Sequence, residues 1–109
     1  MQNYSKNDVI LVRYPFSDLS SSKVRPGVII NTPHISKDVF IVPLTSKTIF
    51  LLPGEFLMED WHNAGLNVIT AVKRGIYTIN TTLVIKKVGQ LSTSDSKRLE
   101  NSLHEWLGF

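Results

Sequence analysis

One arginine has a setting that suits the binding of a phosphate group. Arg25 lies between a serine-rich segment and an apolar run, and Pro26 directly after it favours an extended backbone at this position. A guanidinium fixed in this way offers forked donors that match phosphate oxygens. The plainer interpretation is an arginine that caps the loop or pairs with Asp18, and on these residues alone that interpretation is the stronger one.

A second polar segment follows another apolar run. Thr45 and Ser46 place two hydroxyl groups at the expected end of a strand, and Lys47 follows them. Side chains of these types commonly bind phosphate oxygens in nucleic acids. An ordinary polar strand end has the same composition, so this segment is not specific by itself.

The charged residues are unevenly distributed along the chain. Twelve Lys and Arg against nine Asp and Glu give the 109 residues a net charge of +3. Residues 61–94 contain no carboxylate, but they contain four cations, Lys73, Arg74, Lys86 and Lys87. These cations can form one positive face suited to phosphates. On charge alone, the commoner case is lysines that face water or protect the edge of a sheet.

Several kinds of chemistry are excluded by what the chain lacks. It has no cysteine, which excludes disulfides, thiolate catalysis and cysteine-ligated metal sites. The three histidines, His34, His62 and His104, do not have the spacing of a metal site. The chain also has no glycine-rich phosphate loop and no GxSxG motif. If the protein is an enzyme, we expect it to use no metal and no organic cofactor.

Short β-branched runs separated by Gly and Pro predict a mainly β protein. We expect strands at residues 8–14, 27–31, 39–44, 49–52, 55–58, 67–72, 76–79 and 83–88. No run approaches the roughly 20 apolar residues of a membrane helix, and the N-terminus has no signal-peptide pattern. We therefore expect a cytoplasmic protein with no membrane contact.

The last part of the chain has a helical pattern instead. Ser92 followed by Asp95 is a variant of the capping box, and Gly108 predicts the helix end. Between them an apolar stripe recurs at helical spacing: Leu99, Leu103, Trp106, Leu107. The whole pattern predicts one domain over residues 1–109, a small curled β-barrel capped by a C-terminal helix.

Several segments together resemble the MazF/PemK-like toxins. Residues 7–30, NDVILVRYPFSDLSSSKVRPGVII, resemble the family's opening pattern GDIVLVxFPFTDxSGSKxRPxVV, with Asn7 in place of the first glycine. The resemblance continues through VPLTS (42–46), AGL (64–66), TI (78–79) and KVGQLS (87–92). It spans nearly the whole chain, and its specificity lies in the combination of motifs.

This resemblance implies a fold, an activity and a set of partners. The fold is a plicated SH3-like barrel with a terminal helix, and the assembly is a homodimer. The activity is cleavage of single-stranded RNA at short sequences without the ribosome, by attack of the 2′-hydroxyl. The expected partners are that RNA and a cognate antitoxin whose acidic tail occupies the RNA groove.

The resemblance also assigns residues. Arg25 and Thr45 match the family's arginine before the strand-2 proline and its threonine at the end of strand 3, and both are expected to be catalytic. We expect the substrate to be bound by a further set: Ser22, Lys23, Ser46, Lys47, Thr70, Lys73, Arg74. Bases would be recognised by loops at residues 17–23 and 47–54.

One departure from the family pattern concerns the proton acceptor. Many members have PSxVRxD after AGL, whereas here no acid follows Lys73 and Arg74. Catalysis then depends on cations and hydroxyls, and the general base is left open between Asp18 and His62.

Two alternatives follow from the same resemblance. CcdB-like relatives share the barrel but poison DNA gyrase by contact, which here would use residues 105–109. The missing acid also leaves room for a regulator without nuclease activity.

Overall fold

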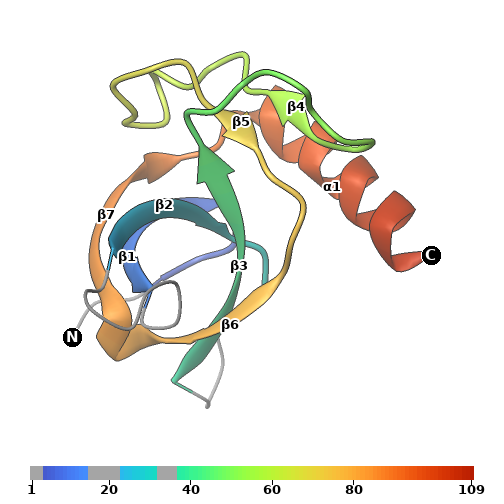
Figure 1. The fold of residues 1–109 in the computed structure, drawn as a ribbon. Helices are drawn as coiled ribbons and strands as arrows, with labels where there is room; N and C mark the ends of the chain where they lie inside the picture. The colour runs from blue at the N-terminus through green and yellow to red at the C-terminus, as the bar shows by residue number, and fades with distance from the viewer. Residues whose placement is uncertain (1–3, 15–22, 32–36) are drawn as a thin grey trace.

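The computed structural model describes residues 4–14, 23–31 and 37–109. Within these ranges the chain forms an antiparallel sheet, a short 3₁₀ helix η1 (Thr81–Leu83) and an α-helix α1 (Thr93–Leu107) (Figure 1). The strands of the sheet are β1 (Asp8–Tyr14), β2 (Lys23–Ile29), β3 (Asp38–Thr45), β4 (Phe56–Leu57), β5 (Ala71–Val72), β6 (Tyr77–Asn80) and β7 (Val84–Gln90).

The strands follow the order β4-β5-β3-β2-β1-β7, and β6 pairs with β3 as well. β3 pairs with β6 over its first half and with β5 at its last two residues. Because one strand serves different neighbours at its two ends, the sheet curls strongly on itself (Figure 1). The predicted fold class, a small SH3-like barrel with a C-terminal helix, is confirmed, with the correction that the sheet is barrel-like and not closed.

The curled sheet is buried on both faces. An inner cluster of aliphatic side chains fills the concave side: Ile10, Val12, Ile29, Val39, Ile41, Ile79. An outer cluster packs between the sheet, the segment before β5 and α1: Val9, Val28, Val42, Leu44, Met58, Ala64, Leu66, Val72, Leu91, Leu99. Alternation along a strand sends successive residues to opposite faces, so β1 and β2 contribute to both clusters.

Helix α1 begins and ends where its sequence signals predict. The Ser92 hydroxyl accepts a hydrogen bond from the Asp95 N–H at 3.1 Å, and Gly108 closes the helix in the left-handed region. The capping-box role predicted for the Asp95 carboxylate is wrong. Its two oxygens accept the backbone N–H groups of Glu59 and Asp60, each at 3.0 Å, and tie the helix to the segment after β4.

Further contacts dock α1 on the loop before β4. The Ser102 hydroxyl donates to the Gly54 carbonyl at 2.7 Å, and the Trp106 indole N–H donates to the Pro53 carbonyl at 3.0 Å. The predicted apolar stripe is buried at its start and increasingly exposed towards its end, where Trp106 is half-buried. The helix therefore supports the segment from residue 53 to residue 60 along its length.

Two glycines allow backbones to meet on the outer face. A Cβ on Gly65 would overlap the Val88 carbonyl, and a Cβ on Gly89 would overlap the Ala64 carbonyl. The AGL and KVGQLS motifs are thus two halves of one close contact between a turn and β7. Any larger residue at either glycine would push these segments apart.

Three of the predicted elements differ from those observed. β2 begins at Lys23 and not at residue 27, residues 49–52 form no strand, and only Ala71 and Val72 of the run 67–72 are in a strand. In the part of the chain that the structure describes, no helix is long and apolar enough to cross a membrane.

Candidate active site

Arg25 lies within β2, two residues after the strand begins. It pairs with Val12 of β1, and its side chain is exposed. The prediction placed it before the strand; the strand starts earlier because β1 and β2 stay paired from Val9↔Val28 to Tyr14↔Lys23. This pairing holds the β2 backbone in place both before and after Pro26, and so it fixes the backbone of Arg25. No described residue forms an ion pair with the Arg25 guanidinium.

The strand register brings Arg25 and Thr45 to the same face of the sheet. β2 and β3 pair up to Gly27↔Pro43, and continuing this register by two residues sets Arg25 opposite Thr45. Side chains two residues apart share a face, so both point to the side on which Ile29 and Ile41 lie. Hydrogen-bonded pairing of the two strands stops just before these residues, which leaves both side chains at the open end of the inner face.

Thr45 carries the hydroxyl group of this site. Its Oγ1 accepts the backbone N–H of Lys47 at 3.0 Å, which orients the hydroxyl and leaves its proton to be donated elsewhere. Ser46 and Lys47 are exposed directly after it. These three residues therefore offer two hydroxyls and one ammonium at a single strand end.

The segment directly after β5 adds a further cation, Lys73, on the side of Thr45. Ala71 pairs with Thr45, and the Lys73 N–H continues the ladder by donating to the Pro43 carbonyl at 2.9 Å. By alternation the exposed side chain of Lys73 projects on the same side as Thr45. Arg74 is exposed beside it.

The position of Arg74 is fixed by a carboxylate that the sequence analysis did not single out. One oxygen of Glu55 accepts the Arg74 N–H at 2.8 Å, and the other accepts the Leu52 N–H at 2.7 Å. Glu55 thus joins the loop after β3 to the segment after β5. Its place after a Pro-Gly turn is a weak sequence signal, because it does not reveal either partner.

The other predicted substrate-binding residues lie in different settings. Lys23 is exposed at the start of β2, on the face of Arg25. Thr70 is only 3% exposed, and its hydroxyl donates to the Val68 carbonyl at 2.8 Å, so it orders the segment before β5. Ser22 lies outside the described residues, and its role stays a prediction.

Of the two candidates for the general base, only His62 lies in the described part of the chain. Asp18 lies outside the described residues. His62 is exposed on the turn after β4, where its ring meets the edge of Trp61 at 5.9 Å between centroids. Among the described residues, no group of three His, Asp or Glu side chains is placed to hold a metal ion.

Lys86 and Lys87 do not join the cations at Thr45. They lie on β7, at the opposite end of the strand order from β5. Lys87 forms an ion pair at 3.1 Å with Asp8, whose side chain is fully buried. The positive face suggested by the charge pattern is therefore divided between two edges of the sheet.

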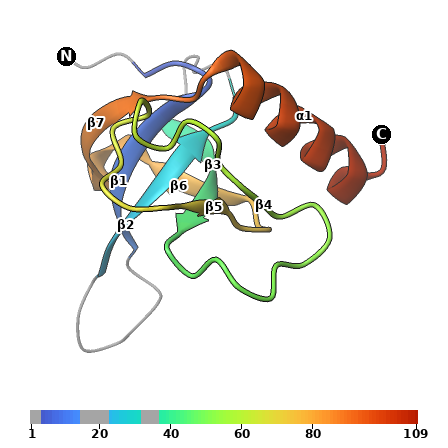
Figure 2. The same ribbon diagram turned by 90° about the horizontal axis from the view of Figure 1, so that it is seen from above.

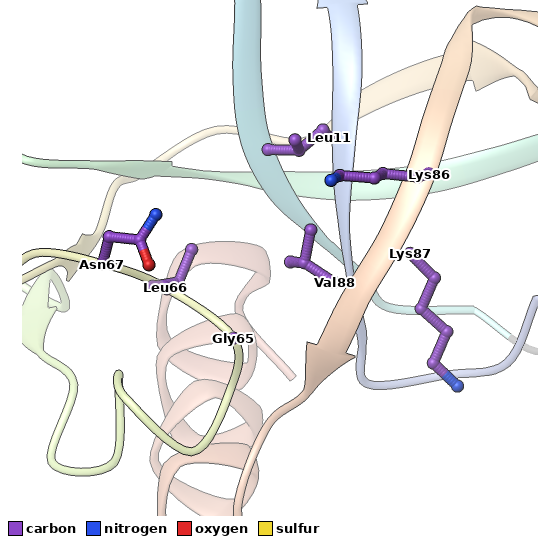
Figure 3. Close-up of a pocket in the computed structure, with 7 residues that line it drawn as sticks. All are labelled: Leu11, Gly65, Leu66, Asn67, Lys86, Lys87 and Val88. Atoms are coloured by element: carbon purple, nitrogen blue, oxygen red, sulfur yellow. The ribbon is translucent and has the colours of Figure 1, made fainter.

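Lys86 instead borders a pocket of about 480 Å³ between β7 and the turn that contains Gly65. Figure 3 shows Lys86 reaching across this pocket towards Leu11, while Lys87 points away. Leu11 alternates with Ile10 and Val12 of the inner cluster. The pocket therefore opens on the face opposite Arg25, and we assign it no part in the candidate site.

Structures with the same fold cover almost the whole chain. An endoribonuclease in complex with its cognate antitoxin, from a Mycobacterial species, matches 97% of this chain and 96% of its own length, at 16% identity and a TM-score of 0.76. The Mycobacterium tuberculosis toxin MazF-mt6 matches 94% of this chain and 97% of its own length, at 21% identity and a TM-score of 0.74. The MazE-MazF structure from Deinococcus radiodurans matches 100% and 99%, at 11% identity and 0.81.

These likenesses define the fold class, a curled antiparallel sheet with a C-terminal helix. The family model of the PemK-like, MazF-like toxins of type II toxin-antitoxin systems matches residues 5–107. The chain belongs to this family. A comparison with curated protein sequences finds no match.

Proposed function

We propose that this toxin is a metal-independent endoribonuclease that cuts single-stranded messenger RNA at short specific sequences. The observation that supports this most is the placement of Arg25, Thr45 and Lys73 on one face, at the open end of the inner side of the sheet. The names of its structural relatives, which include endoribonucleases, agree with this activity. The active unit is a single domain over residues 1–109 that acts in the cytoplasm, where messenger RNA is found.

The proposed reaction uses the RNA's own nucleophile. The 2′-oxygen loses its proton and forms a bond to the adjacent phosphorus, and the bond from phosphorus to the 5′-oxygen breaks. The products are a 2′,3′-cyclic phosphate and a 5′-hydroxyl, once a proton reaches the leaving oxygen. The protein must align these atoms and stabilise the negative charge that develops on the phosphorane.

Each residue of the site has a role suited to its side chain. The Arg25 guanidinium stabilises the phosphorane oxygens, because it binds them in a fork and holds its own proton too tightly to transfer it well. Thr45 donates its free hydroxyl proton to a phosphate oxygen. Lys73 or Arg74 supplies the second cation. Of the two, the Lys73 ammonium protonates the leaving oxygen, because a guanidinium holds its proton too tightly.

The remaining predicted residues bind the substrate strand. Lys23, Ser46 and Lys47 are exposed beside the site and can bind flanking phosphates. Ser22 belongs to the same set by the family resemblance, whereas the buried Thr70 would act on the substrate only by ordering the segment before β5.

We also propose two protein partners. A cognate antitoxin with an acidic segment would cover the cations at this face, and the named antitoxin in one relative supports such a partner. A second copy of the chain would form a homodimer and bring two sets of cations around one groove.

A cleavage assay with matched variants tests this proposal. Purified protein with EDTA and without ribosomes should cut a long single-stranded RNA of mixed sequence at discrete sites. Arg25→Ala should lower the rate by about 10²–10³, as expected for loss of one transition-state donor. The cleavage rate of Thr45→Ala should lie between the rates of Arg25→Ala and the wild type.

Lys97→Ala is the control, because it removes one exposed positive charge from α1, away from the site. It should cut at the wild-type rate, and all variants should keep the wild-type melting temperature. Full activity of Arg25→Ala would contradict the mechanism. If the folded protein cuts no RNA, the proposal fails in favour of a toxin that acts by contact, for which the exposed Leu107 and Phe109 are the candidate surface.

A further inference from the structure

The loop between β3 and β4 exposes an aromatic side chain next to the candidate site. Phe50 is 93% exposed, and Ile49 beside it is 74% exposed. Phe50 also has a φ of 57°, in the left-handed region that bulky side chains rarely adopt. A large apolar side chain held in a strained backbone and in open solvent contributes nothing to the core, so its position calls for a different explanation.

The loop is fixed at both ends, which holds Phe50 in this position. At its start, Thr45 accepts the Lys47 N–H. At its end, Glu55 accepts the Leu52 N–H, and the Glu55 N–H donates back to the Leu52 carbonyl at 2.9 Å.

The same loop end is anchored to two other elements. Glu55 accepts the Arg74 N–H, and the Pro53 and Gly54 carbonyls are bound by side chains of α1. Figure 2 shows the segment after β3 swinging out from the sheet before it returns to β4 beside the helix. The tip of the loop is therefore presented by a supported frame.

We infer that Phe50 is a substrate-binding residue that stacks on one unpaired base of the RNA strand. This inference rests on the proposed ribonuclease function and adds a contact to the same site. Aromatic rings bind unpaired bases by stacking on their faces, and such rings typically lie beside cations that follow the phosphate backbone. Phe50 has a setting of this kind, because the exposed Lys47 precedes it in the loop, and Glu55 binds the backbone of a second cationic residue, Arg74, to the loop's end.

The position along the chain also favours a base as the occupant. Phe50 is five residues beyond Thr45, and both ends of the loop are attached to residues of the candidate site. A strand of RNA whose scissile phosphate lies at Thr45 would extend its neighbouring nucleotides over this loop. A loop backbone that is already anchored presents the ring without first being ordered, which favours affinity.

The test uses an RNA that binds but cannot be cut. The cut site is first mapped with wild-type protein on a long RNA. A labelled oligonucleotide of that sequence is then made with 2′-deoxyribose at the nucleophilic nucleotide, and its Kd is measured by fluorescence anisotropy.

Phe50→Ala and Phe50→Leu should each weaken binding by about 5- to 150-fold, the range reported for loss of one stacked base. Phe50→Tyr should stay within about twofold of the wild type, because it keeps the ring. Ile85→Ala is the matched control, because it removes a partly exposed aliphatic side chain from β7, outside this loop, and it should bind as the wild type does. All four variants should keep the wild-type melting temperature, since neither side chain packs in the core.

A second measurement identifies the stacked base. Each nucleotide of the oligonucleotide is replaced in turn by an abasic one. At one position, the loss of binding free energy from removing the base and the loss from Phe50→Ala should be non-additive, because both changes remove the same contact.

Unchanged binding by Phe50→Ala, wild-type binding by Phe50→Leu, or additive losses at every position would overturn the inference. A smaller mass for Phe50→Ala by light scattering would also overturn it, and would assign the loop tip to contact between copies. These results leave the proposed function intact if wild-type protein still cuts RNA and Arg25→Ala does not. Wild-type protein that cuts no RNA would defeat the proposed function, and this inference with it.

Discussion

Replacing Asp95 by alanine should release helix α1 from the segment after β4 and destabilise the protein strongly. The Asp95 side chain is fully buried, and its two oxygens accept the N–H groups of Glu59 and Asp60. Its contact with Arg98, at 3.6 Å, adds less, because that guanidinium is partly exposed. The two backbone hydrogen bonds therefore dominate the expected loss.

The magnitude follows from those two bonds. A hydrogen bond to a charged group contributes about 1.5–3 kcal/mol, and alanine would leave both N–H groups without their acceptor. Because these groups lie near the surface and water can reach them in part, we take the lower end, a loss of about 3 kcal/mol in the free energy of unfolding. For a domain of this size that corresponds to a fall of roughly 10–20 °C in Tm.

Thermal unfolding followed by circular dichroism measures this change. Glu105→Ala is the control, since it removes an exposed carboxylate from the same helix and should change the stability by less than about 0.5 kcal/mol. The Tm of Asp95→Asn should lie between those of Asp95→Ala and Glu105→Ala, because an amide has only one acceptor oxygen for the two N–H groups. If Asp95→Ala melts within 2 °C of the wild type, roughly the effect of the control, then the carboxylate does not hold the helix in place.

Three further changes test other contacts. Glu55→Gln should lower kcat/KM for RNA several-fold, since an amide cannot accept both N–H groups and the segment with Lys73 and Arg74 loosens; cleavage kinetics measure this constant. Gly89→Ala should lower the stability by about 3 kcal/mol or more, or prevent folding, because its Cβ would overlap a backbone carbonyl; soluble yield and Tm report it. Trp106→Phe should cost about 1 kcal/mol in a denaturant titration through loss of the indole hydrogen bond to Pro53.

Local signals in the sequence predicted the helix and most of the strands. The Ser92 cap and Gly108 each act on the helix turn next to them, and the apolar stripe recurs at helical spacing, so each signal is local; the structure has all three as expected. The strand expected at residues 49–52 is absent. Side chains of α1 bind the Pro53 and Gly54 carbonyls directly after it, and the Arg74 backbone N–H binds the Glu55 carboxylate that holds the Leu52 N–H. Those partners are distant in sequence, so no local pattern predicts them.

The candidate site was predictable in its residues but not in its arrangement. The family resemblance identified Arg25 and Thr45, but only the pairing register of β2, β3 and β5 puts them on one face with Lys73. The charge pattern left one positive face as the less common alternative to lysines at a sheet edge. The strand order decides for the edge in the case of Lys86 and Lys87, because it places them on the terminal strand β7. The exposure of Phe50 also had no sequence signal, since an apolar run reads as a buried strand.

The most direct test of the proposed mechanism compares the cleavage of two RNAs that differ only in one 2′-oxygen atom. Two oligonucleotides carry the mapped cut site, one with ribose and one with 2′-deoxyribose at the nucleotide whose 2′-oxygen attacks, and both are incubated with wild-type protein in EDTA. The account predicts that the ribose form is cut to a 2′,3′-cyclic phosphate and a 5′-hydroxyl, and that the deoxyribose form stays intact. Cleavage of the deoxyribose form, or products with a 5′-phosphate, would mean that water and not the 2′-hydroxyl is the nucleophile.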